Sequence, residues 1–189
     1  MTRRATIAVD IQNDYFSGGR FPLEGMEQAA AQARAVLDAA RARGDLIVHV
    51  RHEFADPSAP FFHPGSEGAD INPAAAPQEN EIVVTKNRVN AFKDTDLQRI
   101  LDDNGVTEVV IVGAMSHMCI DATARAASDY GYKTTVVQDA CATRDLEYGG
   151  MTVPAASVHA AMMSALGFAY ATVTDTDSYV GQGTARAAV

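Results

Sequence analysis

The chain has very little cysteine and no long apolar run. Only two cysteines, Cys119 and Cys141, occur in 189 residues. No apolar stretch approaches the roughly 20 residues of a membrane-spanning helix, and the stretch after the basic start "MTRR" is too short for a signal peptide. We therefore expect a cytoplasmic protein that does not enter a membrane. In such a reducing compartment we expect no structural disulfide.

Positive charge is also scarce. The chain has 15 lysines and arginines against 24 aspartates and glutamates, which gives a formal net charge of −9. Nucleic acids and anionic membranes would repel such a chain, so we expect neither as a partner. We interpret the charge as a contribution to solubility. Because the sequence shows no internal repeat and no linker, it predicts a single domain over residues 1–189.

A glycine-rich phosphate loop is missing as well. The first expected strand is followed by "DIQNDYF", which contains neither G-x-G-x-x-G nor a Walker motif. This absence weighs against a nucleotide-binding or carrier module. That module stays an alternative, which a thermal-shift screen with nucleotides would test.

Short β-branched runs alternate with helical patterns along the chain. We expect strands at 6–9, 46–50, 81–85, 108–112, 133–137 and 170–173. Nearly continuous apolar runs of this kind are typical of parallel strands buried on both faces. We expect helices at 26–43, from a capping box at Thr95 and Gln98 to about 104, at about 119–130, and from Pro154 to Gly167. The fold class is therefore α/β: a three-layer α/β/α sandwich around a central, mostly parallel, six-stranded sheet.

Two segments do not follow this alternation. Residues 54–80 hold five of the seven prolines and are irregular, and long loops of this kind are typically functional. We expect this loop to pack over a site. The tail after about residue 174 is polar and rich in glycine and alanine, so we expect it to be either frayed or an arm that contacts another subunit.

Reactive side chains occur where three of the expected strands end. Asp10 follows the first strand, Lys86 ends the third, and Cys119 follows the fourth after a short turn. Ligands of open parallel sheets bind beyond the carboxyl ends of the strands. At a helix start beside a lysine, Cys119 would be favoured as a thiolate, and Asp10 is suited to accept its proton and return it to a leaving amine. Free N–H groups at the helix start could hold a developing oxyanion, so the set predicts amide cleavage through a thioester.

Each of these residues also has a plainer interpretation. A buried cysteine is more often simple packing, Asp10 alone could cap a turn, and Lys86 alone could be a surface charge. Three reactive types at equivalent ends of central strands favour a catalytic site, although spacing does not establish that they meet. In the loop expected after the fifth strand, we predict that Cys141 packs and that Asp139 caps a helix or binds Arg144.

Three motifs, in this order, resemble a known family. They are "VDIQNDYFSGG", the lysine in "VVTKNRVNAF", and "VIVGAMSHMCIDATARAASDYGYKTTVVQDACAT". They resemble the isochorismatase-like cysteine hydrolases, which include nicotinamidases, N-carbamoylsarcosine amidohydrolases and streptothricin hydrolase, and the resemblance covers roughly residues 5–173. It implies a Rossmann-like fold with a catalytic triad of Asp10, Lys86 and Cys119. It also implies a cis peptide bond at Ala114–Met115, an oxyanion hole formed by the N–H groups of Met115 and Cys119, and a homo-oligomer, dimer or larger.

Comparison within that family narrows the expected chemistry. True isochorismatases cleave a vinyl ether and lack the nucleophilic cysteine, so Cys119 favours hydrolysis of a C–N bond, with ether hydrolysis as the alternative. Nicotinamidases carry an Asp-x-His metal motif after the second strand, where this chain has "VRHEF" without the aspartate. We therefore predict no metal and no other cofactor, and nicotinamide is disfavoured as the substrate. His52, Glu53 and His63 remain the residues that a metal would use.

The expected substrate is a small amide, lactam or carbamoyl compound. Gln12 is placed to orient the acid or to contact the substrate, although a turn hydrogen bond would also explain it. Aromatic side chains are expected to wall the pocket, and each is equally compatible with an ordinary core position: Tyr15, Phe16, Phe61, Phe62 and Phe92.

Overall fold

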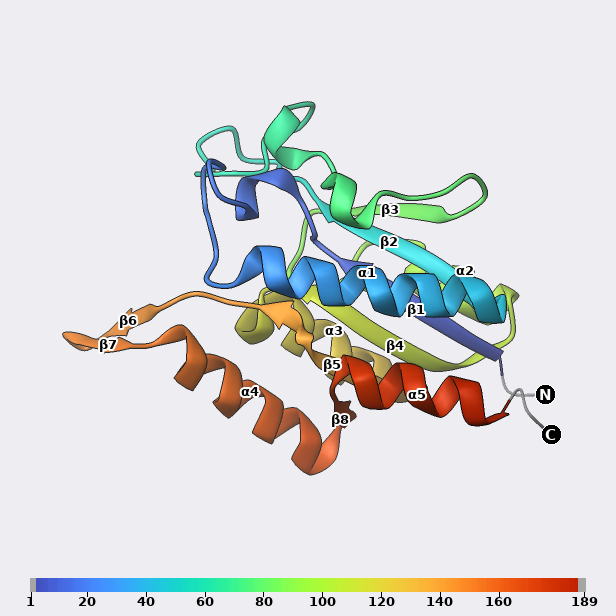
Figure 1. The fold of residues 1–189 in the computed structure, drawn as a ribbon. Helices are drawn as coiled ribbons and strands as arrows, with labels where there is room; N and C mark the ends of the chain where they lie inside the picture. Colours follow the sequence, from blue (N-terminus) through green and yellow to red (C-terminus); the bar gives the residue numbers. More distant parts are fainter. Residues whose placement is uncertain (1–2, 187–189) are drawn as a thin grey trace.

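A six-stranded parallel sheet forms the centre of the protein in the computed structural model, which describes residues 3–186 (Figure 1). In spatial order its strands are β3 (Ile82–Lys86), β2 (Leu46–His52), β1 (Arg3–Val9), β4 (Val106–Ala114), β5 (Lys133–Ala142) and β8 (Thr172–Thr174). Every neighbouring pair is parallel, so all the carboxyl ends lie at one edge of the sheet. Each strand overlaps a predicted one, and the predicted fold class is confirmed.

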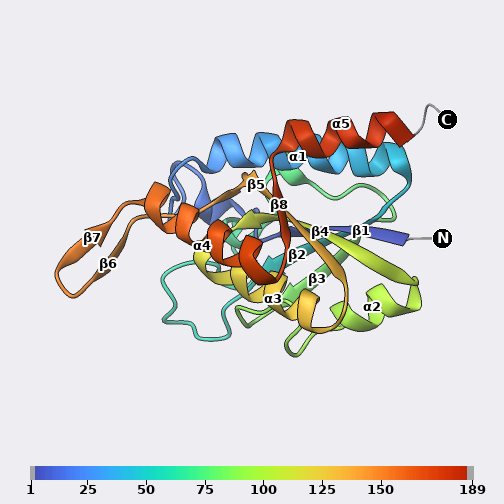
Figure 2. The ribbon, with the colours of Figure 1, turned by 90° about the horizontal axis from the view of Figure 1, so that it is seen from below.

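Helices cover both faces of this sheet (Figures 1 and 2). One face carries α1 (Met26–Arg43) and α5 (Thr176–Arg186), and the other carries α2 (Leu97–Asp103), α3 (Asp121–Asp129) and α4 (Ala155–Ala169). Successive residues of β4 point into the two layers in turn: Val110 and Val112 join the cluster around α1, whereas Val109 and Ile111 join the cluster around α3. Burying a side chain of this size contributes about 1.5–3 kcal/mol, so both layers hold the sheet.

The predicted helix at 26–43 has the predicted boundaries. Its buried residues recur every three to four positions and face the sheet. Gly44 ends the helix in the left-handed conformation, with φ 71°, and its N–H donates to the carbonyl groups of Ala40 and Arg41. A residue with a Cβ adopts this conformation only at a cost, which is why glycine follows the last turn.

Other predicted boundaries are wrong. The capping box is not formed, because the Thr95 hydroxyl accepts a hydrogen bond from Leu97 N (3.3 Å) and the N-cap residue is Asp96. α4 continues through Gly167 to Ala169, since its C-terminal turn is packed against β8. A small antiparallel hairpin, β6 (Leu146–Tyr148) and β7 (Met151–Val153), was not predicted and projects from the body of the protein (Figure 1).

Most of the segment after residue 174 forms the helix α5 rather than a frayed tail, and residues 187–189 lie outside the described part of the chain. Asp139 fastens the start of α5, because the carboxylate accepts hydrogen bonds from the N–H and the hydroxyl of Thr176 (2.9 and 2.8 Å). Asp139 lies within β5, which is longer than predicted, and it caps this helix instead of binding Arg144. Tyr179 then packs α5 against α1 and accepts a hydrogen bond from Arg43. Cys141 is also within β5, where it is buried as predicted.

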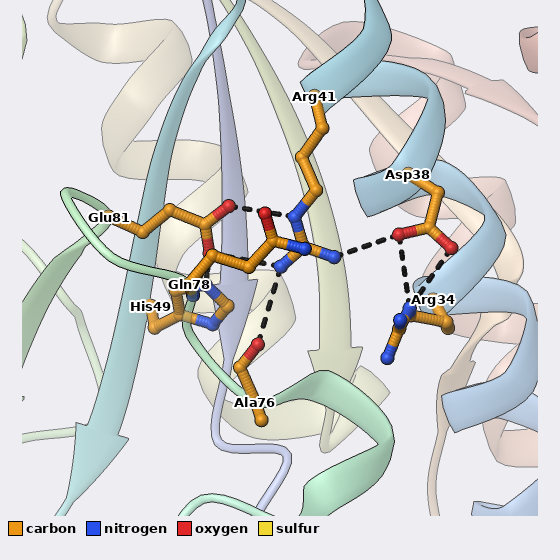
Figure 3. Close-up of polar contacts among 7 residues, drawn as sticks. All are labelled: Arg34, Asp38, Arg41, His49, Ala76, Gln78 and Glu81. Carbon is orange, nitrogen blue, oxygen red and sulfur yellow. Dashed lines mark hydrogen bonds and ion pairs between the residues drawn. The ribbon is translucent and has the colours of Figure 1, made fainter.

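The long segment between β2 and β3 is irregular apart from two 3-10 turns, η2 (Glu67–Ala69) and η3 (Pro73–Ala75). Arg41 of α1 holds the end of this segment that leads into β3. Its guanidinium pairs with Glu81 at 2.7 Å and donates to the Ala76 carbonyl at 3.3 Å (Figure 3). The Glu81 carboxylate also contacts Nε2 of the buried His49 at 2.8 Å. We call Arg41, Glu81 and His49 the loop clasp.

Candidate active site

The three residues predicted at the strand ends meet at the carboxyl edge of the sheet. Nζ of Lys86 lies 2.8 Å from Oδ2 of Asp10 and donates a hydrogen bond to Sγ of Cys119 at 3.2 Å. Lys86 and Asp10 are completely buried, and Cys119 is 4% exposed. An ammonium, a carboxylate and a thiol therefore share one desolvated volume.

The close approach of β1 and β4 places Asp10 beside the turn that carries Cys119. Asp10 is the first residue after β1, with φ 54°, and its N–H donates to the Val50 carbonyl at 2.8 Å. Gly113 near the end of β4 passes so close to β1 that an added Cβ would lie 1.9 Å from the Val9 oxygen. Only glycine fits there, so glycine at position 113 is a requirement of the site's geometry.

Lys86 reaches the site from an edge strand. It is the last residue of β3, and β2 lies between β3 and β1. Its side chain therefore extends past β2 to reach Asp10. The residue that Lys86 passes is His52, which is its register partner on β2.

Burial controls the protonation of the site. It raises the pKa of the Cys119 thiol, and the Asp10 carboxylate raises that pKa further, whereas Lys86 lowers it. Desolvation and Asp10 together outweigh the lysine, so the pKa of Cys119 is shifted in the direction opposite to the one expected from the helix start and the lysine alone. Burial also raises the pKa of Asp10 despite the nearby ammonium, which brings its proton affinity closer to that of the thiol. Burial lowers the pKa of Lys86, but the charges of Asp10 and Cys119 outweigh it and raise that pKa overall.

His52 belongs to the site, although the sequence suggested it only as a metal ligand. Its Nδ1 lies 2.7 Å from Nζ of Lys86, and the residue is 4% exposed. Burial and the lysine charge lower the pKa of His52 to about 3, so the ring is neutral. The signal that could have found it is the register of β2 and β3, which pairs His52 with Lys86 once both strands extend beyond their predicted ends.

Asp10, His52 and Cys119 form a set of potential metal ligands, whose donor atoms lie within 4.8 Å of one another. Nζ of Lys86 lies 2.7 to 3.2 Å from an atom of each of them. The protein's own ammonium thus occupies the centre of this donor set, and a metal ion there would have to displace it. This geometry supports the prediction of a site that works without a metal.

The other two residues considered as metal ligands lie outside this set. Glu53 pairs with Arg51, its neighbour two positions before. The ring of His63 contacts the carbonyl oxygen of Ala59 within its own loop. Both interactions are local and hold the loop rather than the site.

Cys119 sits in η4 (Ser116–Ile120), a π-helical turn that leads into α3. The peptide bond Ala114–Met115 is cis, as predicted. The Met115 carbonyl accepts hydrogen bonds from the N–H groups of Met118 and Ile120, which closes the turn. The Ser116 hydroxyl contacts the Ala142 carbonyl (3.2 Å), and so the turn is also fastened to β5. The N–H groups of Met115 and Cys119 remain the predicted oxyanion hole.

Gln12 is fully buried and its side-chain amide is engaged by the protein. Its Nε2 donates to the carbonyl groups of His52 and Ala69 (2.9 and 2.8 Å), and its Oε1 accepts the His52 N–H (2.7 Å). These bonds to backbone groups fit the plainer alternative, in which Gln12 makes structural hydrogen bonds, and they join β2 to the loop beside the site. They do not support direct contact with the substrate.

The aromatic side chains predicted to wall the pocket lie in two places. Tyr15 is buried, and the charges of Asp10 and Cys119 contribute to its raised pKa, which has burial as its main cause. The rings of Phe61 and Phe62 pack at tilted angles against Tyr15, with centroids 5.5 and 4.6 Å away, and the partly buried Phe16 packs against the same cluster. Phe92 is on the other face of the sheet, in the cluster that contains Cys119.

A model of the isochorismatase domain matches residues 4–178 of the chain. The chain belongs to the isochorismatase family. A solved structure described as an isochorismatase hydrolase, from Oleispira antarctica, is 55% identical with a TM-score of 0.92 and covers 95% of this chain and 97% of its own. The isochorismatase family protein YddQ of Bacillus subtilis is 45% identical over 176 residues, which are 93% of this chain and 98% of YddQ. Streptothricin hydrolase of Streptomyces noursei is 35% identical over 170 residues, 87% of this chain and 59% of that protein.

Two further relatives of this chain are named maleamate amidohydrolase and ureidoacrylate amidohydrolase. The triad-like arrangement of Asp10, Lys86 and Cys119 is therefore found in a hydrolase of this family, as the resemblance implied. In the part of the chain that the structure describes, no helix is both long and apolar enough to cross a membrane.

Proposed function

We propose that this protein is a cysteine-dependent hydrolase that cleaves an amide-type C–N bond of a small molecule. The observation that carries the proposal is the single buried ammonium of Lys86, which contacts both the carboxylate of Asp10 and the sulfur of Cys119. A surface lysine or a packing cysteine needs no such partner, whereas covalent catalysis needs a nucleophile, a base and a fixed charge within reach of one another.

The first half of the proposed reaction forms a thioester. Sγ of Cys119 attacks the carbonyl carbon of the substrate as Asp10 takes the thiol proton. The carbonyl oxygen becomes an oxyanion, which the N–H groups of Met115 and Cys119 stabilise. When the C–N bond breaks, Asp10 gives its proton to the nitrogen, and ammonia or an amine leaves.

The second half regenerates the thiol. Water attacks the thioester carbonyl while Asp10 takes one of its protons. The C–S bond then breaks, the acid is released, and the proton returns from Asp10 to sulfur. Lys86 stays charged throughout and offsets the negative charge that moves between the carboxylate and the sulfur. The proposed cycle needs no cofactor.

The substrate class is a small amide, lactam or carbamoyl compound. The relatives that are named amidohydrolases support a C–N bond as the point of cleavage. Phe62, whose ring centroid lies 6.2 Å from that of His52, brings the cluster of Tyr15, Phe61 and Phe62 next to the site. We propose that this aromatic cluster, rather than Gln12 or Phe92, contacts the substrate.

The experiment that tests the proposal is an ammonia-release screen over a panel of small amides, with mass spectrometry of the protein after rapid quenching. Native protein is expected to release ammonia from at least one amide and to carry an acyl adduct on Cys119. Cys119→Ala should abolish turnover while folding normally, and Cys141→Ala, the matched control, should keep it. Ammonia release by Cys119→Ala would refute the proposal, because the amide bond would then be cleaved without the cysteine.

We also propose that the protein works as a homo-oligomer in the cytoplasm. Large apolar side chains on the hairpin and on α4 support self-association: Tyr148 is 84% exposed, Met151 65% and Phe168 92%. α4 contains no lysine, arginine, aspartate or glutamate, so two copies with a net charge of −9 could meet there without bringing charges together.

A further inference from the structure

His52 has no part in the reaction proposed above, yet it makes the shortest polar contact of Lys86. The Nδ1–Nζ distance is 2.7 Å, against 2.8 Å to Asp10 and 3.2 Å to Cys119. A buried imidazole that served only to fill space would be replaced at lower cost by an apolar ring, because burying a polar group is unfavourable. The position of His52 therefore calls for a functional explanation.

Three hydrogen bonds engage the Lys86 ammonium, as many as it has N–H groups. They join Nζ to Nδ1 of His52, to the carbonyl oxygen of Arg88 at 3.0 Å and to Sγ of Cys119. Oδ2 of Asp10 is an ion-pair partner at 2.8 Å, and neither oxygen of that carboxylate has a hydrogen-bond partner among the described residues. His52 and Arg88 thus fix the nitrogen between the two groups that exchange a proton.

The protonation of His52 suits this role. A neutral ring that accepts at Nδ1 carries its hydrogen on Nε2, and Nε2 is buried without a hydrogen-bond partner among the described residues. Among the residues that the structure describes, the ring therefore makes one polar contact, the one to Lys86. A protonated His52 could not accept that hydrogen bond, and its pKa of about 3 keeps it neutral over the working range.

Neighbouring residues hold His52 in place from both sides. Gln12 bonds to both the N–H and the carbonyl of its backbone. Phe54 packs against its ring, with centroids 4.3 Å apart. The imidazole is thus a rigid support, and Gln12 contributes to the site through it.

We propose that His52 is a positioning residue that holds the Lys86 ammonium against the sulfur of Cys119. This inference rests on the proposed function. Without the Nδ1 acceptor, the strongest remaining attraction of the ammonium is the Asp10 carboxylate, since a full negative charge outweighs a neutral thiol. The ammonium then turns towards Asp10, and the thiolate that forms on Cys119 loses its nearest donor.

A pair of variants of similar shape isolates the acceptor. His52→Asn places an amide oxygen near the position of Nδ1, whereas His52→Leu has similar volume and no acceptor. Both are made in a Cys141→Ala background, and the rate of alkylation of Cys119 by iodoacetamide is measured from pH 6 to pH 10 by mass spectrometry. The groups that face the sulfur in this profile are Asp10, Lys86, His52 and Tyr15.

His52→Leu is expected to move the profile to higher pH and to slow alkylation at pH 8 roughly tenfold, because one pKa unit changes the thiolate population tenfold. His52→Asn should stay within about threefold of the Cys141→Ala parent. Loss of the ring alone would affect both variants equally, so equal profiles for Asn and Leu, or a shift of the Leu profile to lower pH, would overturn the proposal. If His52→Leu does not fold, His52→Phe, which keeps a ring beside Phe54, replaces it in the same comparison.

The control variant is His63→Leu, which removes a histidine of the segment that follows β2, whose ring contacts the Ala59 carbonyl instead of Lys86. It should leave the profile unchanged. Failure of the proposed function is a separate result, since it appears in the Cys141→Ala parent itself as an unreactive Cys119 or in turnover by Cys119→Ala. If Cys119 reacts normally in the Cys141→Ala parent but the two His52 variants have the same alkylation profile, only the role of His52 is refuted.

Discussion

Asp10 and Lys86 form an ion pair, with 2.8 Å between Oδ2 and Nζ, in which both side chains are completely buried. Removing two charges from water is costly, and the attraction between them compensates only while both are present. The folded protein therefore tolerates these two buried charges only while both are present. This relationship gives a prediction that needs no substrate.

Lys86→Met should lower the free energy of unfolding by about 3–5 kcal/mol, because it leaves the Asp10 carboxylate buried without its partner. The double variant Asp10→Asn/Lys86→Met should recover much of that loss, since neither buried charge remains. Urea unfolding followed by circular dichroism measures both at pH 7. Additive losses in the double variant would mean that the two charges do not compensate each other.

The pH dependence of Cys119 should respond to the two charges in opposite directions. Because burial and Asp10 raise the thiol pKa, alkylation of native Cys119 by iodoacetamide should keep increasing well above pH 8. Asp10→Asn removes a charge that raises this pKa, so its profile should move to lower pH. Lys86→Met removes a charge that lowers it, so its profile should move to higher pH.

Mass spectrometry of Cys119 in a Cys141→Ala background measures these profiles. The background matters because Cys141 is also buried, with its pKa raised to about 12. A shift in the same direction for both variants would show that general disturbance of the site, rather than charge, decides the reactivity.

The sequence could predict the triad because the chemistry lies at positions that the fold class itself brings together. Asp10 and Cys119 follow strands and Lys86 ends one, and the carboxyl ends of parallel strands share one edge. The same reasoning places His52 after the second expected strand, but it does not reveal the role of that residue. Its role depends on a strand that runs two residues beyond its predicted end and on a register that pairs it with Lys86. Neither quantity is encoded in local spacing.

The pKa shift of Cys119 and the helix α5 were mispredicted for a similar reason. The helix start and the lysine can be read from the local sequence, and both lower the pKa of the Cys119 thiol. The desolvation that raises this pKa depends on how completely the rest of the fold buries the site, which the local sequence does not show. α5 contains glycines that disfavour helix locally. It forms because Asp139 caps its start and Tyr179 packs it onto α1, and both contacts are between residues far apart in the sequence.

The loop clasp should stabilise the protein in a pH-dependent way. Glu81 has its pKa lowered to about 2: burial opposes this shift, but hydrogen bonds from Arg41, Gln78 and His49 outweigh it. A lowered folded-state pKa means that the contribution of this carboxylate is complete above about pH 4.5, the ordinary value, and is lost as the pH falls towards 2.

Glu81→Gln should therefore cost about 2–3 kcal/mol at pH 7, and the difference from native protein should shrink between pH 5 and pH 3. Arg34→Gln is the matched control, because Arg34 pairs with Asp38 at the exposed end of the same network (Figure 3) and should matter by about 0–1 kcal/mol at any pH. Urea unfolding at several pH values measures these differences. If Glu81→Gln lowered the free energy of unfolding by the same amount at every pH, the role of the Glu81 charge would be contradicted.

Self-association should depend on the hairpin and on α4. A helix that is apolar on most of its surface is typically covered, and an isolated two-stranded hairpin is marginally stable in water. Phe168→Asp and Tyr148→Asp should therefore shift the native oligomer towards monomer in sedimentation velocity, because each places a charge in the proposed contact. Tyr130→Asp introduces the same charge at another exposed aromatic residue, 51% exposed at the end of α3, and should leave the sedimentation coefficient unchanged. A native protein that sediments as a monomer would refute the proposal, and an oligomer that withstands both changes would place its contact elsewhere.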